Sequence, residues 1–171
     1  MHRHGGSLGL ALGPALLLGL LSTGCNDATE GQEFFQADLS GANEVPPRET
    51  GATGTCAFVV SGDRVDFNIT TFGLSAPVVG AHIHLGPAGA NGPVRVGFIN
   101  PNLAGTNTQT PFNAPDGILM ENSFGGSDVG GGLTLADILG AMRTGDAYCN
   151  IHTSNFPGGE IRGQIRPISV D

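Results

Sequence analysis

The chain has 171 residues, with 7 basic and 15 acidic side chains that give a formal net charge of −8. Nucleic acids and anionic membrane surfaces are bound through basic patches, so this balance argues against both as partners. The length suits a single domain with a substantial core, and one Tyr, no Trp and 29 Gly are typical of short strands joined by many turns.

The first 24 residues indicate export. Residues 8–21 are apolar and follow Arg3, but they are too few to cross a hydrocarbon core of about 30 Å as a helix. The segment Leu21-Ser-Thr-Gly-Cys25 is similar to a bacterial lipobox, in which the cysteine is lipidated after cleavage; an ordinary secretory signal cut nearby is the alternative. We therefore expect residues 1–24 to be a lipoprotein signal peptide and Cys25 to carry the lipid. Asn26 after the cysteine favours the outer membrane or the surface of a bacterial cell envelope.

Residues 25–32 form a polar tether, and the domain is expected to span residues 33–168. Its first three predicted strands cover residues 33–39, 52–60 and 64–72. In the third of these strands apolar and polar residues alternate, which is the pattern of a strand with one buried face. The short Ser-Gly-Asp turn before it predicts that the second and third strands form a hairpin.

The three histidines outside the leader fall in two further predicted strands, residues 78–85 and 148–153. Side chains alternate across a strand, so His82 and His84 share one face of the first strand, and His152 lies on one face of the second. The opposite face of each strand is apolar and is predicted to face the core. The three histidines should therefore point away from the core, either towards solvent or beneath a covering loop.

The connecting segments are rich in turn residues. Residues 86–93 form a predicted loop of Gly and Pro, followed by a strand at 94–99, a long polar loop at 100–116 and a strand at 117–124. The glycine-rich residues 124–132 lack a following Lys, so we expect a flexible loop there and not a phosphate-binding loop.

One helix is predicted after this loop. Thr134 is the expected N-cap residue, with Asp137 three positions later, and Gly145 ends the helix. The apolar residues between them fall at helical spacing, which indicates packing against the core.

The last predicted strand covers residues 160–166, and alternation places Glu160 and Arg162 on the face beside His152. The simplest role for these two charges is an ion pair across that face, worth about 0–1 kcal/mol if exposed. Anchoring of the segment at residues 46–47 by Arg162 is the alternative.

These elements together predict an all-β fold, an antiparallel β-sandwich or flattened barrel of seven to eight short strands with one short helix in a connection. Lipidation of Cys25 would leave Cys56 and Cys149, and two cysteines in an exported chain most simply form one disulfide. Two buried free thiols are the alternative.

Several segments resemble the chordin-type domain known as CHRD, in the expected order and over most of the chain. These segments are Phe35-Gln-Ala-Asp-Leu-Ser-Gly41, Glu44-Val-Pro-Pro47, Ala81-His-Ile-His-Leu-Gly-Pro-Ala88, Asn91-Gly-Pro93, Ile151-His-Thr153 and Gly158-Gly-Glu-Ile-Arg-Gly-Gln164. The resemblance implies an extracytoplasmic β-rich module, found singly in secreted bacterial proteins and in several copies in animal chordins, which bind bone morphogenetic proteins. It implies no established activity for the single-domain bacterial members.

The His-x-His strand is also similar to the copper-binding strand of copper–zinc superoxide dismutases. Those enzymes bind copper with four histidines, whereas this chain offers three outside the leader, and no zinc site with a bridging histidine can be assembled. Superoxide dismutation is therefore not expected.

Two functional hypotheses remain. The first is a lipid-anchored binding or structural module that recognises a protein or glycan of the envelope without catalysis, because no catalytic set of Ser, His and Asp can be identified. The second is a zinc or copper site made of His82, His84 and His152, with Glu160 or water as fourth ligand; bound water would then open a route to a metal-dependent enzyme.

A hydrogen-bonded cluster that pins loop 86–93 to the terminal hairpin is the alternative role of the three histidines. A shared ion requires their nitrogens to lie within about 4 Å of one another, and a separation beyond about 8 Å excludes it.

Overall fold

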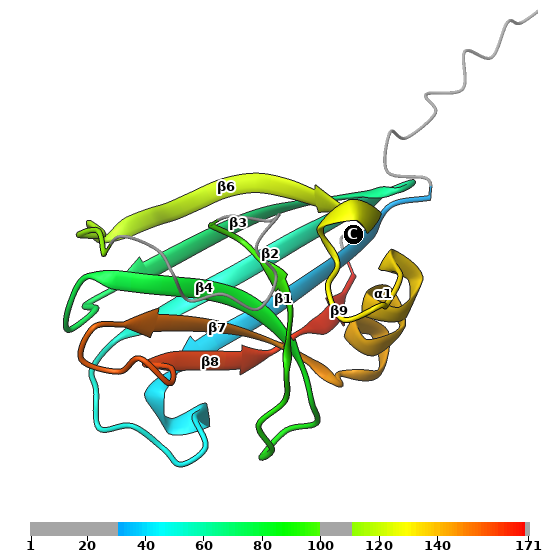
Figure 1. Ribbon diagram of the computed structural model, residues 1–171. Coiled ribbons are helices and arrows are strands. Elements are labelled where there is room, and N and C mark those ends of the chain that lie inside the picture. Colours follow the sequence, from blue (N-terminus) through cyan, green and yellow to red (C-terminus); the bar gives the residue numbers. More distant parts are fainter. Residues whose placement is uncertain (1–30, 100–110, 170–171) are drawn as a thin grey trace, which may run out of the picture. The chain divides into compact units, whose positions relative to one another are not determined.

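The computed structural model describes residues 31–99 and 111–169. Within this part, the strands form one antiparallel sheet that bends into a nearly closed barrel, with a single α-helix in a connection (Figure 1). The order across the sheet is β5-β4-β7-β8-β1-β2-β3-β6, and β9 pairs with β1. The predicted fold class is therefore confirmed. The strands are β1 (Glu33–Ser40), β2 (Thr53–Ser61), β3 (Arg64–Phe72), β4 (Val78–Leu85), β5 (Val94–Gly97), β6 (Gly117–Gly125), β7 (Ala147–Thr153), β8 (Ile161–Gln164) and β9 (Arg166–Ile168).

The predicted hairpin of β2 and β3 is confirmed. The two strands pair from Ser61 and Arg64 at the turn, and Gly62 in that turn has a φ of 62°, a conformation that glycine adopts without strain. The alternating apolar residues of β3 are buried, with Val65 and Ile69 fully inaccessible to solvent. This half of the barrel therefore follows directly from the period-two pattern of its sequence.

The predicted helix is confirmed as α1 (Leu135–Thr144). Thr134 and Asp137 cap its first turn reciprocally, because the Thr134 side chain accepts a hydrogen bond from the Asp137 N–H and the Asp137 carboxylate accepts one from the Thr134 N–H. Gly145 ends the helix in the left-handed conformation. The helix contacts β7 and β9, so it closes one side of the core.

Replacing Thr134 with Ala is expected to lower the free energy of unfolding by about 1 kcal/mol, because the first turn loses its N-cap acceptor. Chemical denaturation of the purified protein measures this loss, with Thr55→Ala, a change on strand β2 remote from any helix end, as the comparison. A Thr134→Ser variant should keep most of the stability because its hydroxyl can still accept the bond. Equal stability of the Ala variant and the parent protein would contradict the capping role.

The last predicted strand is divided in two. Ile165 separates β8 from β9 and donates its N–H to the carbonyl of Ala147, and Glu160 lies just before β8 instead of inside it. The 3₁₀ turns η1 (Gly41–Asn43) and η3 (Gly126–Asp128) complete the described elements. The predicted signal peptide, Cys25, most of the predicted tether and most of loop 100–116 lie outside the described residues. Within the described residues no helix is long and apolar enough to cross a membrane.

The predicted disulfide joins Cys56 on β2 to Cys149 on β7 through the middle of the core. Both cysteines are inaccessible to solvent and belong to the same buried cluster as the aromatic residues of β2 and β3. The bond closes a loop with a sequence separation of 93 residues. It therefore ties the strand that carries His152 to the far wall of the barrel.

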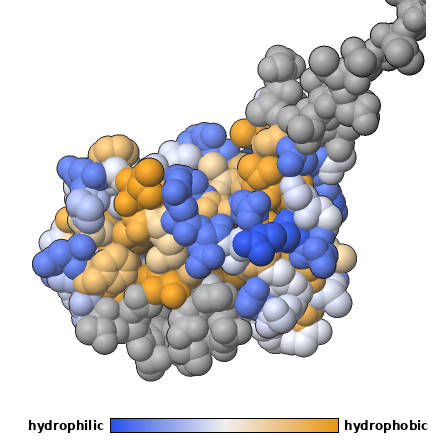
Figure 2. All heavy atoms as spheres, turned by 90° about the horizontal axis from the view of Figure 1, so that it is seen from above, coloured by the Kyte–Doolittle hydropathy of each residue, from blue (hydrophilic) through white to orange (hydrophobic). Residues whose placement is uncertain are grey.

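The outer surface over β3 and β6 mixes apolar and polar residues, as Figure 2 shows from above. Phe72 and Ile118, at one end of these strands, are exposed by 50% and 58%. Scattered apolar side chains of this kind are normal on an exposed sheet face and mark no site by themselves.

Candidate metal centre

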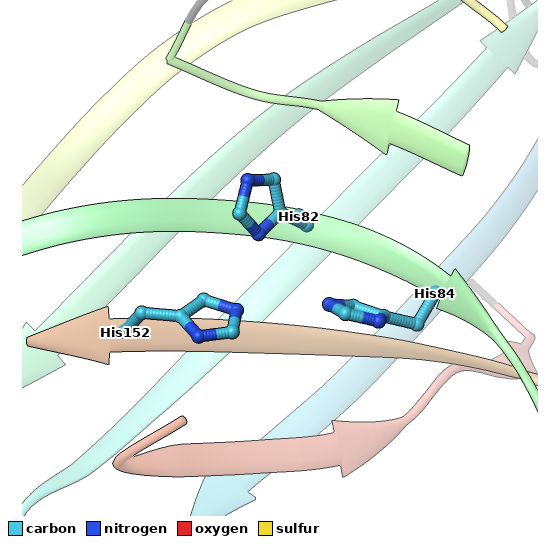
Figure 3. A group of neighbouring side chains, drawn as sticks. All are labelled: His82, His84 and His152. Atoms are coloured by element: carbon cyan, nitrogen blue, oxygen red, sulfur yellow. The ribbon is translucent and has the colours of Figure 1, made fainter. Parts of the chain in front are cut away.

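The three predicted histidines lie together on two paired strands. In the antiparallel register of β4 and β7, His82 is opposite Asn150, and Gly80 is opposite His152. Residues opposite each other in a sheet share a face, so His82, His84 and His152 project from the same side, as Figure 3 shows. The alternation of side chains predicted this shared face correctly.

The opposite face of the same strands forms the barrel interior. Ala81 is paired with Ile151, and Ile83 with Cys149, and these side chains are buried in the core. The histidines lie on the outer face, yet His82, His84 and His152 are only 4%, 8% and 3% exposed. Of the two predicted environments, the structure therefore shows the one beneath covering loops.

Two loops cover the site and bond directly to it. The Nδ1 atom of His84 lies 2.9 Å from the carbonyl oxygen of Gly92, and Nδ1 of His152 lies 3.0 Å from that of Pro157. Gly92 can take this position because it has no side chain, since a Cβ there would lie 1.6 Å from the carbonyl oxygen of Leu85. The turn chemistry of residues 86–93 thus brings a backbone acceptor onto His84.

These backbone bonds fix the tautomer of two rings. A carbonyl oxygen only accepts, so Nδ1 of His84 and of His152 carries the proton, and Nε2 of each ring keeps a free lone pair. Within residues 31–99 and 111–169, both Nε2 atoms and Nδ1 of His82 are buried without a hydrogen-bond partner. An imidazole with one nitrogen bonded to a backbone carbonyl and the other bare is the usual state of a histidine that binds metal.

The geometry brings one nitrogen of each ring within reach of a common ion. These three atoms lie within 4.8 Å of one another. Zinc–nitrogen bonds of about 2.0–2.1 Å require nitrogens roughly 3.4 Å apart, so the most widely separated pair must close by up to about 1.4 Å on binding. The separation is slightly more than the expected 4 Å and well short of the distance that excludes a shared ion.

Burial keeps the rings neutral. Loss of hydration, with smaller effects from the neighbouring histidines, lowers the pKa of His82 to about 3. Loss of hydration also lowers the pKa of His152, to about 4, with His84 adding to the effect, and it lowers the pKa of His84 itself. A metal ligand must be unprotonated, and these rings meet that condition at neutral pH.

The metal-free protein is expected to lose stability as the pH falls below 6.5. A histidine whose pKa is lower in the folded chain than its ordinary 6.5 stabilises the fold above that value, because only the unfolded chain takes up protons as the pH falls towards the folded pKa. His82 and His152 should each contribute at most about 1.4 kcal/mol per pH unit to the slope of the free energy of unfolding against pH. Urea unfolding in the presence of a chelator at pH 7.5, 6.5 and 5.5 measures this slope. A His152→Gln variant should show a shallower slope, and identical slopes would contradict the neutral buried state.

The structure does not support the expected roles of Glu160. Its carboxylate accepts hydrogen bonds from the Thr50 hydroxyl, the Ser75 N–H and the Thr153 hydroxyl. These bonds turn it away from His152, and the group of potential ligands within the described ranges contains the three histidines alone. Glu160 is therefore a buried structural carboxylate, and neither a fourth ligand nor the ion-pair partner of Arg162.

Arg162 instead holds one of the covering loops, residues 86–93, together with the 3₁₀ turn η1. It is 2% exposed and donates hydrogen bonds to the Asn43 carbonyl, the Ala90 carbonyl and the Asn91 side chain. This agrees with the predicted alternative of an anchor for the segment that contains residues 46–47, but the bonds are to the residues just before it and to loop 86–93.

Tyr148 connects Arg162 to the histidines, a contact that the sequence analysis missed. The Arg162 guanidinium lies 4.4 Å from the centre of the Tyr148 ring, and that ring stacks on His84 at 4.8 Å with an interplanar angle of 11°. The Tyr148 hydroxyl also accepts a hydrogen bond from the Gly92 N–H. Its position in β7, which shares the face of His152, was the available signal.

Asn150 lies between Tyr148 and His152 on the same face of β7, and its side chain bonds to Glu44. Asn150, opposite His82, donates from its side chain to the Glu44 carboxylate and to the Ile161 carbonyl. Burial of Glu44 raises the pKa of its carboxyl group, against smaller opposing effects from Asn150 and Arg162. This carboxyl group is thus engaged by an amide and is separate from the histidine group.

The fold and the site together describe an antiparallel β-barrel domain with three buried histidines beneath loops on its outer face. A family model described as the CHRD domain matches residues 35–165, and the chain belongs to this family. The predicted resemblance is therefore confirmed, and CHRD domains are typically extracellular modules. No curated protein and no solved structure matches the chain.

Proposed function

We propose that this chain is a lipid-anchored CHRD module of a bacterial cell envelope that binds one zinc or copper ion through His82, His84 and His152. The observation that carries the proposal is the convergence of three buried ring nitrogens within 4.8 Å of one another. Imidazole nitrogens suit both ions.

The unused nitrogens favour a ligand set over a purely structural cluster. A buried polar atom without a partner costs about 1–3 kcal/mol, and the site contains three such atoms on rings that do not bond to one another in the described structure. Pinning of the loops needs only the Nδ1 atoms of His84 and His152, which are already bonded to backbone. A bound ion gives the remaining nitrogens the partner that packing does not supply.

Metal retention tests the proposal directly. The mature chain, incubated with zinc or copper(II) and dialysed, is expected to keep about one equivalent of metal, because three imidazoles can share one ion. A His82→Ala/His84→Ala variant should keep none. An Asp63→Asn variant, changed in the exposed β2–β3 turn, is the matched control and should bind like the parent chain. Equally low metal in parent and double variant would overturn the metal site.

The lipid anchor rests on the leader sequence. Residues 1–24 resemble a lipoprotein signal and place Cys25 at the cleavage point, and extracellular location is typical of the family. Cells grown with a fatty-acid analogue should label the parent chain and not a Cys25→Ser variant. Label on both chains, or on neither, would contradict the anchor.

Recognition of an envelope glycan or protein is a second candidate function, favoured by a surface cavity beside the site. The cavity has a volume of about 440 Å³, and its polar lining includes Asn43, Glu44, Arg162 and Gln164. Hydrogen-bonding side chains of this kind suit a polar ligand. Binding of purified envelope glycans to the parent chain, but not to a Gln164→Ala variant, would support it, and equal binding would not.

A further inference from the structure

We infer that the three-histidine site selects copper in its monovalent state, Cu(I), over Zn(II). This inference rests on the proposed metal site and concerns which ion that site prefers. It follows from the charge of the site, from the number of ligands and from the cover over the rings.

The ligand group carries no negative charge. In the described residues it consists of His82, His84 and His152, and two of these rings are bonded through Nδ1 to neutral backbone carbonyls. A bound ion therefore keeps its full charge in a largely dehydrated place. The cost of burying a charge grows with its square, so a divalent ion costs about four times as much as a monovalent one.

The surrounding charges add to this preference. The Arg162 guanidinium lies over Tyr148, which stacks on His84, so a positive group stands one ring away from the site. The Glu160 carboxylate accepts three hydrogen bonds and the Glu44 carboxylate accepts one from Asn150, so neither of them belongs to the ligand group. The Arg162 guanidinium, one ring away from His84, therefore disfavours a second positive charge on the ion.

The coordination number points the same way. Zinc in proteins is almost always four-coordinate, and a site with three protein ligands takes water or substrate as the fourth. Imidazole nitrogens also suit copper, and the d10 ion Cu(I) accepts three of them in a plane. The described residues supply three nitrogens, and the rings are at most 8% exposed, which leaves little room for a water molecule as a fourth ligand. A trigonal arrangement needs nitrogens roughly 3.5 Å apart at bonds of about 2.0 Å, which is the same small closure that zinc would require.

Competition for each ion tests the inference. Under anaerobic conditions the mature chain is titrated against bicinchoninate for Cu(I), and in parallel against a chromophoric zinc chelator for Zn(II). The dissociation constant for Cu(I) is expected to be at least about a hundredfold lower than that for Zn(II), and both ions should be lost from the His82→Ala/His84→Ala variant.

A charge-changing variant sharpens the test. Replacement of His152 with Glu adds one negative charge to the ligand group, so the preference should shift towards Zn(II) by at least about tenfold. If this variant does not fold, the ratio of the Cu(I) and Zn(II) dissociation constants of the parent protein decides whether the site prefers Cu(I). Zinc bound as tightly as Cu(I), with loss in the double variant, would overturn the inference and leave the metal site standing. Retention of neither ion by the parent chain would overturn both.

Discussion

Removal of the Cys56–Cys149 disulfide is expected to lower the free energy of unfolding by about 4–5 kcal/mol. The bond closes a loop with a sequence separation of 93 residues, and the chain-entropy model gives a loss of this size for a loop of that length. Since both cysteines are buried and connect opposite walls of the barrel, the constraint acts on most of the fold.

Chemical denaturation of a Cys56→Ala/Cys149→Ala variant measures this loss. The parent protein unfolded in the presence of a thiol reductant is the matched control, because it loses the bond without a change of side-chain volume. Metal retention by the folded variant should persist, since Cys149 lies on the face of β7 opposite His152. A loss of less than about 1 kcal/mol in both samples would contradict the role assigned to the bond.

Replacement of Arg162 with Met is expected to weaken both the fold and the metal site. Arg162 is buried and gives hydrogen bonds to Asn43, Ala90 and Asn91, and bonds from a charged donor contribute about 1.5–3 kcal/mol each. Non-additivity among neighbouring bonds reduces the sum, so we expect a loss of about 3 kcal/mol or more. The loop that carries Gly92 would also lose its anchor, and the ring of His84 is oriented by that residue.

The Arg162→Met variant should bind metal with an affinity about 10–100-fold lower than that of the parent protein, because loss of the hydrogen bonds that support metal ligands typically has an effect of this size. An Arg162→Lys variant keeps the charge but not the planar fork, so it should recover only part of the loss. Denaturation and chelator competition are measured on the same preparations. Parent-like stability together with parent-like affinity in the Met variant would contradict the role of Arg162.

The alternation of apolar and polar residues was sufficient to predict much of this molecule. It located β3, put His82 and His84 on one face, and placed the apolar partners of β4 and β7 in the core. Period-two patterns report which side of a sheet a residue occupies, and these strands are regular enough to keep that period.

Burial of the histidines could not be predicted in the same way. Alternation shows that a side chain leaves the core, but only the path of the loops shows whether it then meets water. Here Gly92 and Pro157 lie over the outer face and bring backbone carbonyls to the rings. The close approach of Gly92 to Leu85 depends on tertiary packing that the sequence of the loop does not specify.

Glu160 shows where the alternation fails. Gly159 precedes it with a φ of 120°, and a Cβ at Gly159 would lie 2.6 Å from the Glu44 carboxylate. This left-handed residue interrupts the period of two just before β8 begins, so Glu160 turns towards Thr153 and not towards His152. The prediction began the last strand at residue 160, whereas β8 begins at Ile161, and alternation extended to a residue outside the strand placed the carboxylate on the wrong face.

X-ray absorption spectroscopy of the metal-loaded mature chain tests the central claim, that His82, His84 and His152 share one ion. We expect a first shell of about three nitrogens at roughly 2.0–2.1 Å, with the outer-shell scattering of imidazole rings and no sulfur. A shell dominated by oxygen, with the same spectrum from the His82→Ala/His84→Ala variant, would show that the ion lies elsewhere and that the three rings do not form a metal site.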